Sequence, residues 1–150
     1  MFTVTIATDP ADRARCLTLR RFVFIDEQGV PERDELDALD DVCTHFLAID
    51  DEGNAIGTAR LRFVDGHAKA QRVAVLAAWR GRGVGRALMR AFEAFATRGG
   101  AKDVVLSAQI TAVPFYERLG YRAHGPVYDD AGIPHRDMSK PLDDPSGAKD

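Results

Sequence analysis

The segment from residue 80 to residue 86 combines arginines and glycines at a spacing that favours binding of a phosphorylated ligand. A helix that begins here leaves backbone N–H groups unpaired and carries partial positive charge at its start. Glycines let that backbone approach a ligand closely, and arginines add full charges, so the segment suits a diphosphate. Its members are Arg80, Gly81, Arg82, Gly83, Val84, Gly85 and Arg86.

Two other phosphate-binding motifs are excluded by the same residues. A Walker A loop needs Gly-Lys followed by Ser or Thr, whereas Gly85 is followed here by Arg86 and Ala87. A dinucleotide fingerprint needs a third glycine where this chain has Arg86, and it opens a βαβ unit. For the loop taken alone, a basic turn without a ligand remains the alternative.

The elements that position this loop follow from hydrophobic periodicity. Before the loop, alternating apolar and polar residues around an Asp65-Gly66 turn predict an antiparallel meander. After it, apolar residues at helical spacing predict a helix that ends at Gly99-Gly100. Strands are expected at residues 3–7, 45–50, 55–64, 67–76, 103–107, 121–128 and 135–140, and further helices at 11–28 and 112–119.

The order of these elements is β-α-β-β-β-α-β-α-β-β. It predicts an α/β sandwich in which a mixed, mostly antiparallel sheet carries helices on both faces. A length of 150 residues fits one domain. We expect that domain to span residues 1–142, and residues 143–150 to form a disordered tail.

Two motifs in this order give a resemblance to a known family. Arg80, Gly83 and Gly85 match the Arg/Gln-x-x-Gly-x-Gly/Ala core of the acetyl-CoA-binding motif of the GCN5-related N-acetyltransferases (GNAT). The segment 109–121 is similar to the family's Asn-x-x-Ala followed by Phe-Tyr-Glu-Lys-Leu-Gly-Phe. It keeps Ala112 and replaces the Asn by Gln109.

Further motifs resemble one branch of this family, the ElaA-like branch. They are FVFIDEQGVP at residues 22–31, Glu-x-Asp-x-x-Asp at 35–40 and Gly-Ile-Pro-His-x-x-Met at 132–138. The resemblance covers essentially residues 15–140. It implies the GNAT fold and an acyltransferase that takes its acyl group from acetyl-CoA.

The resemblance also implies roles for individual residues. It implies that the strand 72–76 diverges from the strand 103–107, so that the backbone of Val73, Ala74 and Val75 pairs with the pantetheine arm of coenzyme A. Tyr116 matches the family's usual general acid, which protonates the leaving thiolate. Aromatic core packing is the alternative for Phe115 and Tyr116. The remaining cofactor-binding residues implied are those of the loop 80–86 with Gln109, Ala112, Phe115 and Tyr116.

The general base is left open among several side chains. The candidates are Glu27, Glu35, Asp37, Asp40, His45 and His135. Taken singly, each is more often a solvated charge or a structural partner than a base. The acidic segment 27–41 would favour a cationic acceptor, and a solvated acidic loop is the alternative.

These observations predict an N-acetyltransferase that moves the acetyl group of acetyl-CoA to a primary amine of a small molecule or peptide by direct attack. A non-catalytic acyl-CoA-binding module is the alternative, which Tyr116 disfavours because a pure binder needs no acid. The net charge of −3 disfavours a nucleic-acid partner. The acceptor, the length of the acyl chain and the oligomeric state, a homodimer included, stay open.

The remaining composition fits a cytoplasmic protein. The first ten residues lack the basic and apolar regions of a signal peptide, and no apolar run approaches the ~18 residues of a membrane-spanning helix. Cys16 and Cys43 match no metal or redox spacing, so they predict reduced, buried thiols and no metal.

Overall fold

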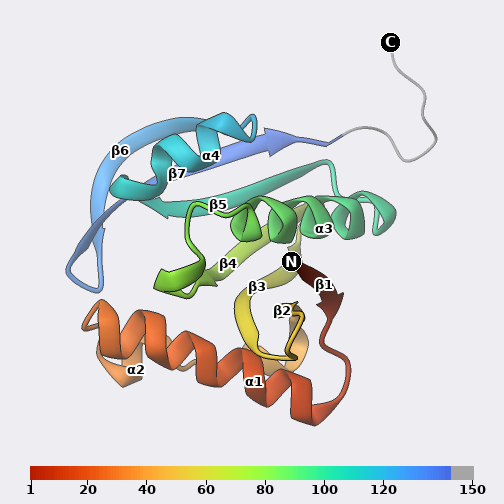
Figure 1. Cartoon of the computed structure of the whole chain (residues 1–150). Coiled ribbons are helices and arrows are strands. Elements are labelled where there is room, and N and C mark those ends of the chain that lie inside the picture. The colour runs from red at the N-terminus through yellow and green to blue at the C-terminus, as the bar shows by residue number, and fades with distance from the viewer. Residues whose placement is uncertain (143–150) are drawn as a thin grey trace. The chain divides into compact units, whose positions relative to one another are not determined.

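The computed structural model describes residues 1–142, and its main elements follow the predicted order (Figure 1). The strands are β1 (Phe2–Ile6), β2 (Thr44–Asp50), β3 (Ala55–Val64), β4 (His67–Val75), β5 (Asp103–Gln109), β6 (Arg122–Asp130) and β7 (Ile133–Pro141). The α-helices are α1 (Pro10–Arg20), α2 (Glu32–Glu35), α3 (Val84–Arg98) and α4 (Val113–Arg118). The segment 143–150, expected to be a disordered tail, lies outside the described residues.

The seven strands pair in the order β1-β2-β3-β4-β5-β7-β6. The pair β4–β5 is parallel, whereas β1–β2, β2–β3, β5–β7 and β6–β7 are antiparallel. The mixed, mostly antiparallel sheet confirms the predicted α/β fold class. The short helix α2 and a 3-10 turn at Asp40–Val42 lie where the sequence predicted only a loop.

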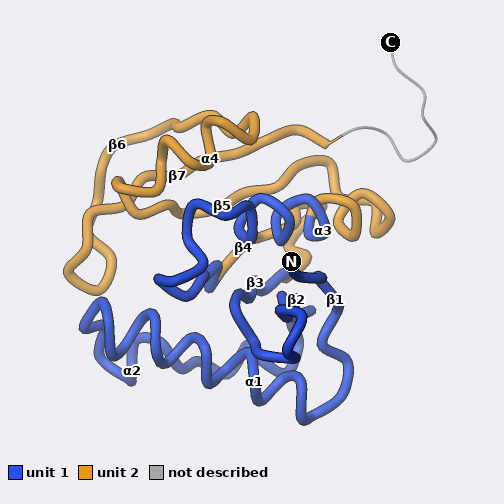
Figure 2. Tube along the Cα trace, viewed as in Figure 1, with its two compact units in different colours: residues 1–61, 72–92 blue, residues 62–71, 93–150 orange. Residues whose placement is uncertain are grey.

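The contacts within the chain separate it into two compact units (Figure 2). Unit 1 contains residues 1–61 and 72–92, and unit 2 contains residues 62–71 and the chain from residue 93 onward. The boundaries fall inside β3, β4 and α3. The sequence-based assignment of residues 1–142 to one domain stays a prediction.

Helices cover both faces of β3 within unit 1. A Cβ on Gly57 would lie 2.9 Å from Val84 and Leu88, so the start of α3 packs directly on this strand and requires a glycine there. The side chain of the next residue, Thr58, lies beside Cys16 of α1, and both donate to the Phe46 carbonyl. Because neighbouring residues of a strand point to opposite faces, α1 and the start of α3 cover opposite faces of β3 (Figure 1).

The helix predicted at residues 11–28 has a different second half. Asp9 caps α1 through a 2.7 Å hydrogen bond from the backbone N–H of Asp12, and Pro10 occupies its first turn. After Arg20 the chain continues as a π-helix, Arg21–Glu27, in which Gln28 N–H donates to the Val23 carbonyl five residues back. The wider turn changes the direction in which its last side chains point.

Unit 2 is built around β5, which pairs with β7 along its whole length and with the first residues of β4. The parallel register runs from His67–Asp103 to Ala70–Leu106. The end of α3 is held in this unit by Glu93, which accepts from Tyr121 Oη at 2.8 Å and from Lys140 Nζ at 3.0 Å.

Neither a membrane-crossing helix nor a metal cluster occurs in the described part of the chain. No helix there combines the length and apolarity needed to cross a bilayer. No group of three or more His, Cys, Asp and Glu side chains is placed to hold a metal ion. Cys16 is buried and Cys43 is half-buried, and no disulfide joins them.

Candidate active site

The predicted diphosphate loop joins β4 to α3 in unit 1. Gly81 and Gly83 adopt φ values of 74° and 88°, a left-handed conformation that other residues rarely take. A Cβ built on either glycine meets no atom within 4 Å. The glycines are therefore needed for the backbone conformation, and open space lies beside the loop at the start of α3. A diphosphate-binding loop fits these residues.

The arginines of the loop are differently engaged. Both terminal nitrogens of Arg80 pair with the carboxylate of Glu27, at 2.5 and 2.7 Å, and its Nε donates to the Val75 carbonyl at 3.0 Å. Arg82 lies over the ring of Trp79, 3.9 Å from its centroid, a cation–π contact. Arg86 is exposed on the first turn of α3. Arg80 therefore ties the π-helix to the end of β4.

The ion pair with Arg80 makes Glu27 a poorer proton acceptor. Hydrogen bonds from Arg80 lower the pKa of Glu27. A carboxylate with a lowered pKa is a weak proton acceptor at neutral pH. In this arrangement Glu27 positions Arg80 more effectively than it would deprotonate an amine.

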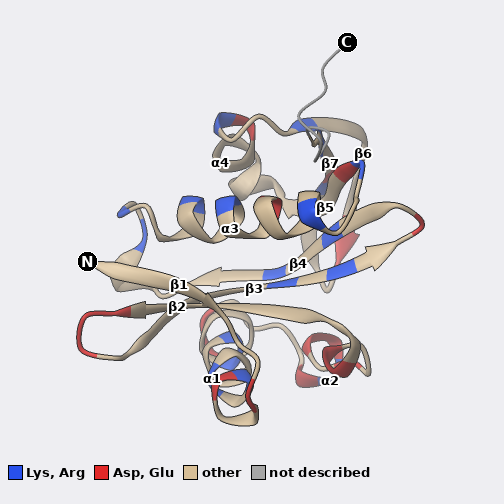
Figure 3. Cartoon of the chain, turned by 90° about the vertical axis from the view of Figure 1, so that its right-hand side faces the viewer, with Lys and Arg blue, Asp and Glu red and all other residues tan. Residues whose placement is uncertain are grey.

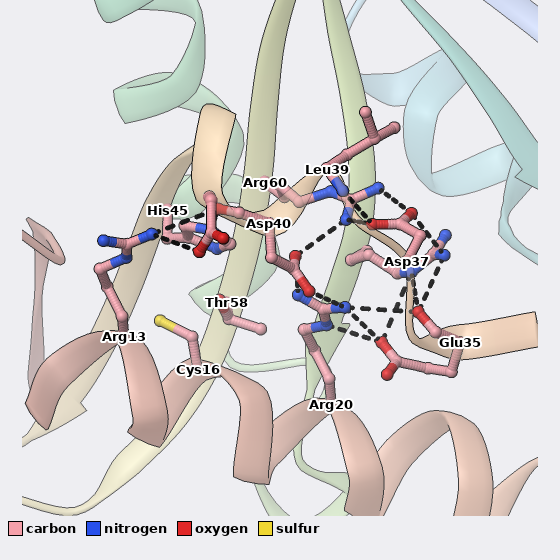
Figure 4. A network of polar contacts seen from close by, with 12 residues as sticks. Arg13, Cys16, Arg20, Glu35, Asp37, Leu39, Asp40, His45, Thr58 and Arg60 are labelled. Carbon is pink, nitrogen blue, oxygen red and sulfur yellow. Dashed lines mark hydrogen bonds and ion pairs between the residues drawn. The ribbon is translucent and has the colours of Figure 1, made fainter. Parts of the chain in front are cut away.

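A cluster of buried charges in unit 1 holds the acidic segment in place (Figure 4). Arg20 is fully buried; its Nε lies 2.7 Å from Glu35 Oε1, and its Nη1 lies 2.7 Å from Asp40 Oδ1. Arg60, also buried, donates to Asp37 at 2.9 and 3.0 Å and to Asp40 at 2.9 Å. Three carboxylates of the acidic segment thus neutralise two arginines that would otherwise be buried without partners.

This cluster contradicts the idea of a uniformly solvated acidic loop. Glu35 is only 2% exposed. Acidic residues are concentrated on α2 (Figure 3), and the exposed ones there include Glu32, which pairs with Arg21 at 2.5 Å. The segment therefore has a buried side, which binds arginines, and an exposed side.

The same cluster makes three of the candidate bases, Asp37, Asp40 and His45, poorer proton acceptors. Burial raises the pKa values of Asp37 and Asp40, but hydrogen bonds and charges of the arginines outweigh it, so both values lie below the usual range. His45 is 3% exposed, and burial lowers its pKa. Its Nε2 lies 2.9 Å from the Asp40 carbonyl, so Nε2 carries the proton and its buried Nδ1 is the bare nitrogen.

Arg72 of strand β4 contacts this cluster. The φ of Arg72, 55°, is left-handed, and such a conformation costs a non-glycine residue about 1–2 kcal/mol. Its side chain contacts the acidic segment, donating to the Glu35 carbonyl at 3.0 and 3.2 Å and to Asp37 Oδ2 at 3.3 Å. The predicted pantetheine-binding residues Val73, Ala74 and Val75 follow directly. The predicted divergence of this strand from residues 103–107 stays a prediction.

Unit 2 holds the other predicted residues. Tyr116 of α4 is 7% exposed and packs edge-on against Phe115 and Tyr121, with ring centroids 4.9 and 5.6 Å apart. Burial raises its pKa, so the phenol keeps its proton at neutral pH. Ala112 lies in the 3-10 turn Ile110–Ala112 just before α4. Tyr116 is therefore both part of an aromatic cluster and a potential proton donor.

The strand register brings His135 of β7 beside Gln109 of β5. His135 Nδ1 lies 2.7 Å from the Ile133 carbonyl, which can only accept, so Nδ1 carries the proton and Nε2 is the basic nitrogen. The imidazole stacks on Tyr128, with centroids 6.3 Å apart. Tyr128 Oη donates to Asp137 at 2.6 Å and also contacts Ser107.

Comparison with known proteins identifies the family of this chain. Residues 24–142 match the family model described as "Acetyltransferase (GNAT) domain". The chain belongs to the GNAT acetyltransferase family. It is therefore an acyltransferase of the N-acetyltransferase type.

Several relatives of this GNAT protein share most of their length with it. The "uncharacterized N-acetyltransferase" YjcF of Bacillus subtilis is 42% identical over 123 residues, which are 81% of this chain and 87% of YjcF. An acyl-CoA N-acyltransferase from Pseudomonas aeruginosa, known from its crystal structure, is 31% identical in sequence. Its structure matches with a TM-score of 0.80 over 93% of this chain and 98% of that protein. Escherichia coli ElaA is 28% identical, with a TM-score of 0.82, covering 93% and 99%.

Sequence reasoning missed the arginine half of the buried cluster. Arg60 stands in the middle of the apolar strand AIGTARLRFV, and Arg20 lies on a helix beside apolar residues. A buried guanidinium must be paired, and the acidic segment between them supplies the carboxylates. That combination was the available signal. Nothing in the sequence marked Tyr128 and Asp137 as partners, because their contact depends on strand register.

We expect Glu35→Gln to lower the free energy of unfolding by about 2–4 kcal/mol. Removing one partner of a buried pair typically costs 3–5 kcal/mol, and Arg20 keeps Asp40 as a second partner. Denaturant unfolding monitored by circular dichroism measures the change.

Glu32→Gln is the matched control, because Glu32 lies on the same short helix as Glu35 and its pair with Arg21 is exposed. An exposed pair contributes about 0–1 kcal/mol, so this variant should remain close to wild type. Equal losses in the two variants would show that burial of the Glu35 pair has no special weight.

Proposed function

We propose that this protein transfers the acetyl group of acetyl-CoA to a primary amine of a small molecule or peptide. The observation that carries the proposal is the glycine-dependent loop 80–86 at the start of α3, in a chain of the GNAT family. The name of the Pseudomonas aeruginosa relative, an acyl-CoA N-acyltransferase, supports a coenzyme A thioester as the donor.

The donor would be held mainly by backbone groups. N–H groups of the first turn of α3 and the loop before it would bind the diphosphate, with the exposed charge of Arg86 nearby. The backbone of residues 73–75 would bind the pantetheine arm, and an N–H near Val75 would stabilise the oxyanion. One such donor contributes about 2.7–4 kcal/mol in a comparable site. Gln109, Ala112 and Phe115 stay donor-binding residues that the resemblance implies.

The proposed reaction is a direct displacement. The amine nitrogen attacks the thioester carbonyl carbon, the C–N bond forms, and the C–S bond breaks. A base takes the proton that the nitrogen loses, and Tyr116 gives a proton to the departing sulfur. The raised pKa of Tyr116 keeps the phenol protonated until the thiolate appears.

We assign the role of base to His135. Glu27 and Asp40 have lowered pKa values because they pair with arginines, and His45 is enclosed beside the buried cluster. The hydrogen bond from Nδ1 of His135 leaves Nε2 as the proton acceptor. Stacking on Tyr128 fixes the plane of the ring.

The donor assignment predicts that Gly83→Asp weakens binding of coenzyme A at least tenfold, about 1.4 kcal/mol. The substitution places a side chain and a negative charge in the loop that faces the diphosphate. Calorimetry on folded protein measures it. Gly53→Asp is the control, because Gly53 has a similar φ of 85° in the β2–β3 turn. Unchanged affinity in Gly83→Asp would place the donor elsewhere.

The acid assignment predicts that Tyr116→Phe lowers kcat by ~10²–10⁴ while coenzyme A affinity stays nearly constant. A screen of amines for thiol release from acetyl-CoA first supplies the acceptor. Tyr121→Phe removes a neighbouring hydroxyl that bonds Glu93 and should keep kcat. A Tyr116→Phe enzyme with full kcat in the chemical step would leave Tyr116 as a packing residue.

The base assignment predicts a pH-dependent loss in His135→Gln. At neutral pH kcat should fall by ~10²–10⁴. The loss should shrink as the pH approaches the amine's own pKa, about 10.4 for a lysine-like amine, because an amine that is already neutral needs no base to free its lone pair for attack. His124→Gln, which changes an exposed histidine of β6, is the control. A loss in His135→Gln that is independent of pH argues against this role.

A further inference from the structure

One residue of β4 has a backbone conformation that its residue type disfavours. Three non-glycine residues among residues 1–142 have positive φ: Asp65, Arg72 and Ala131. Asp65 and Ala131 lie in turns, whereas Arg72 lies inside a strand. Such a conformation persists only where the surrounding structure imposes it.

The side chain of Arg72 contacts the acidic segment. The Arg72 guanidinium donates to the backbone carbonyls of Asp34 and Glu35 at 3.0–3.3 Å and to Asp37 Oδ2 at 3.3 Å. Its Nε also lies 3.4 Å from Glu35 Oε1. A guanidinium is a planar fork of donors, so contacts with acceptors on three neighbouring residues fix its position and plane.

The acceptors are themselves held in place. Glu35 is bound to the buried Arg20, and Asp37 is bound to the buried Arg60. The segment 34–37 is therefore anchored to Arg20 of α1 and Arg60 of β3, which belong to unit 1 together with Arg72. Because its own position is fixed by these buried ion pairs, the segment 34–37 offers Arg72 acceptors at fixed positions.

We propose that the segment 34–37 is a clamp that holds Arg72 in its left-handed conformation and thereby sets the backbone orientation of residues 73–75 for the acyl donor. Arg72 is a positioning residue, since it acts through the strand that follows it. The inference rests on the proposed function, in which this strand binds the pantetheine arm.

The physical reason lies in the period of a strand. Successive residues point to opposite sides, so a change at one position alters the direction of every group that follows. A residue with unusual φ is one way in which a strand is bulged and its next groups are re-aimed. Without the clamp, an arginine returns to negative φ, and the N–H and C=O groups of residues 73–75 are re-oriented.

Three variants of Arg72 distinguish positioning of residues 73–75 from direct ligand binding by the guanidinium. Glycine adopts positive φ without help, so Arg72→Gly should keep coenzyme A affinity within about threefold of wild type. Arg72→Ala lacks both the clamp and that freedom, and should lose at least tenfold. Arg72→Lys keeps the charge without the fork and should resemble alanine. Arg21→Ala, which breaks an exposed pair with Glu32 in the same region, should bind as wild type.

The measurement is calorimetric titration with coenzyme A at a temperature where circular dichroism shows every variant folded. Wild-type affinity in Arg72→Ala or Arg72→Lys overturns the proposal, since the clamp would then serve stability alone. An Arg72→Gly loss as large as that of alanine also overturns it, because the guanidinium would then act directly. If Arg72→Ala does not fold, Arg72→Lys and Arg72→Gly decide.

Amide hydrogen exchange distinguishes a failure of this inference from a failure of the proposed function. In protein without ligand, the peptide covering residues 71–76 should exchange faster in Arg72→Ala and Arg72→Lys than in wild type and Arg72→Gly. If that order holds but wild type does not bind coenzyme A, the donor assignment fails and the clamp stands. Equal exchange in all four proteins overturns the clamp.

Discussion

The burial of Arg20 and Arg60 is the constraint on which the rest of unit 1 depends. A guanidinium out of contact with water must be paired and hydrogen-bonded, and Glu35, Asp37 and Asp40 provide those pairs. The segment between α1 and β2 is therefore not a free connection. It is folded inward, it forms the short helix α2 within its course, and its backbone carbonyls face Arg72.

Two kinds of ion pair flank the proposed donor strand, and they differ in environment. The contacts of Arg72 start from a buried cluster, which is shielded from salt. The pair of Arg80 with Glu27 is exposed at both side chains, 43% and 42%, so it can rearrange when a diphosphate approaches. The strand is thus held by a buried cluster at Arg72 and by an exposed ion pair of Arg80 near its other end. Such an arrangement suits a site that binds a charged ligand.

In unit 2 the arrangement of chemical groups follows from strand register. Antiparallel pairing sets His135 beside Gln109 on one side and Tyr128 on the other. A shift of one residue would turn each of these side chains to the opposite face. The two-residue connection 131–132 and the pairing of β7 with β5 fix that register. The hydrogen bond from Nδ1 to the Ile133 carbonyl, within β7 itself, decides which nitrogen of His135 carries a proton.

The sequence by itself determined the order of helices and strands along the chain, the glycine loop 80–86 and the family, because periodicity, turn residues and motif spacing are local properties. It also named Tyr116 and His135 as candidates for proton transfer. It could not show that Glu35, Asp37 and Asp40 are ion-pair partners, since Arg20 and Arg60 lie 15–23 residues away from them along the chain. Nor could it place the π-helix or the left-handed Arg72, which local preference disfavours. Those features were decided by tertiary structure alone, because only folding brings the buried charges together, and their pairing imposes a conformation that the local sequence would not choose.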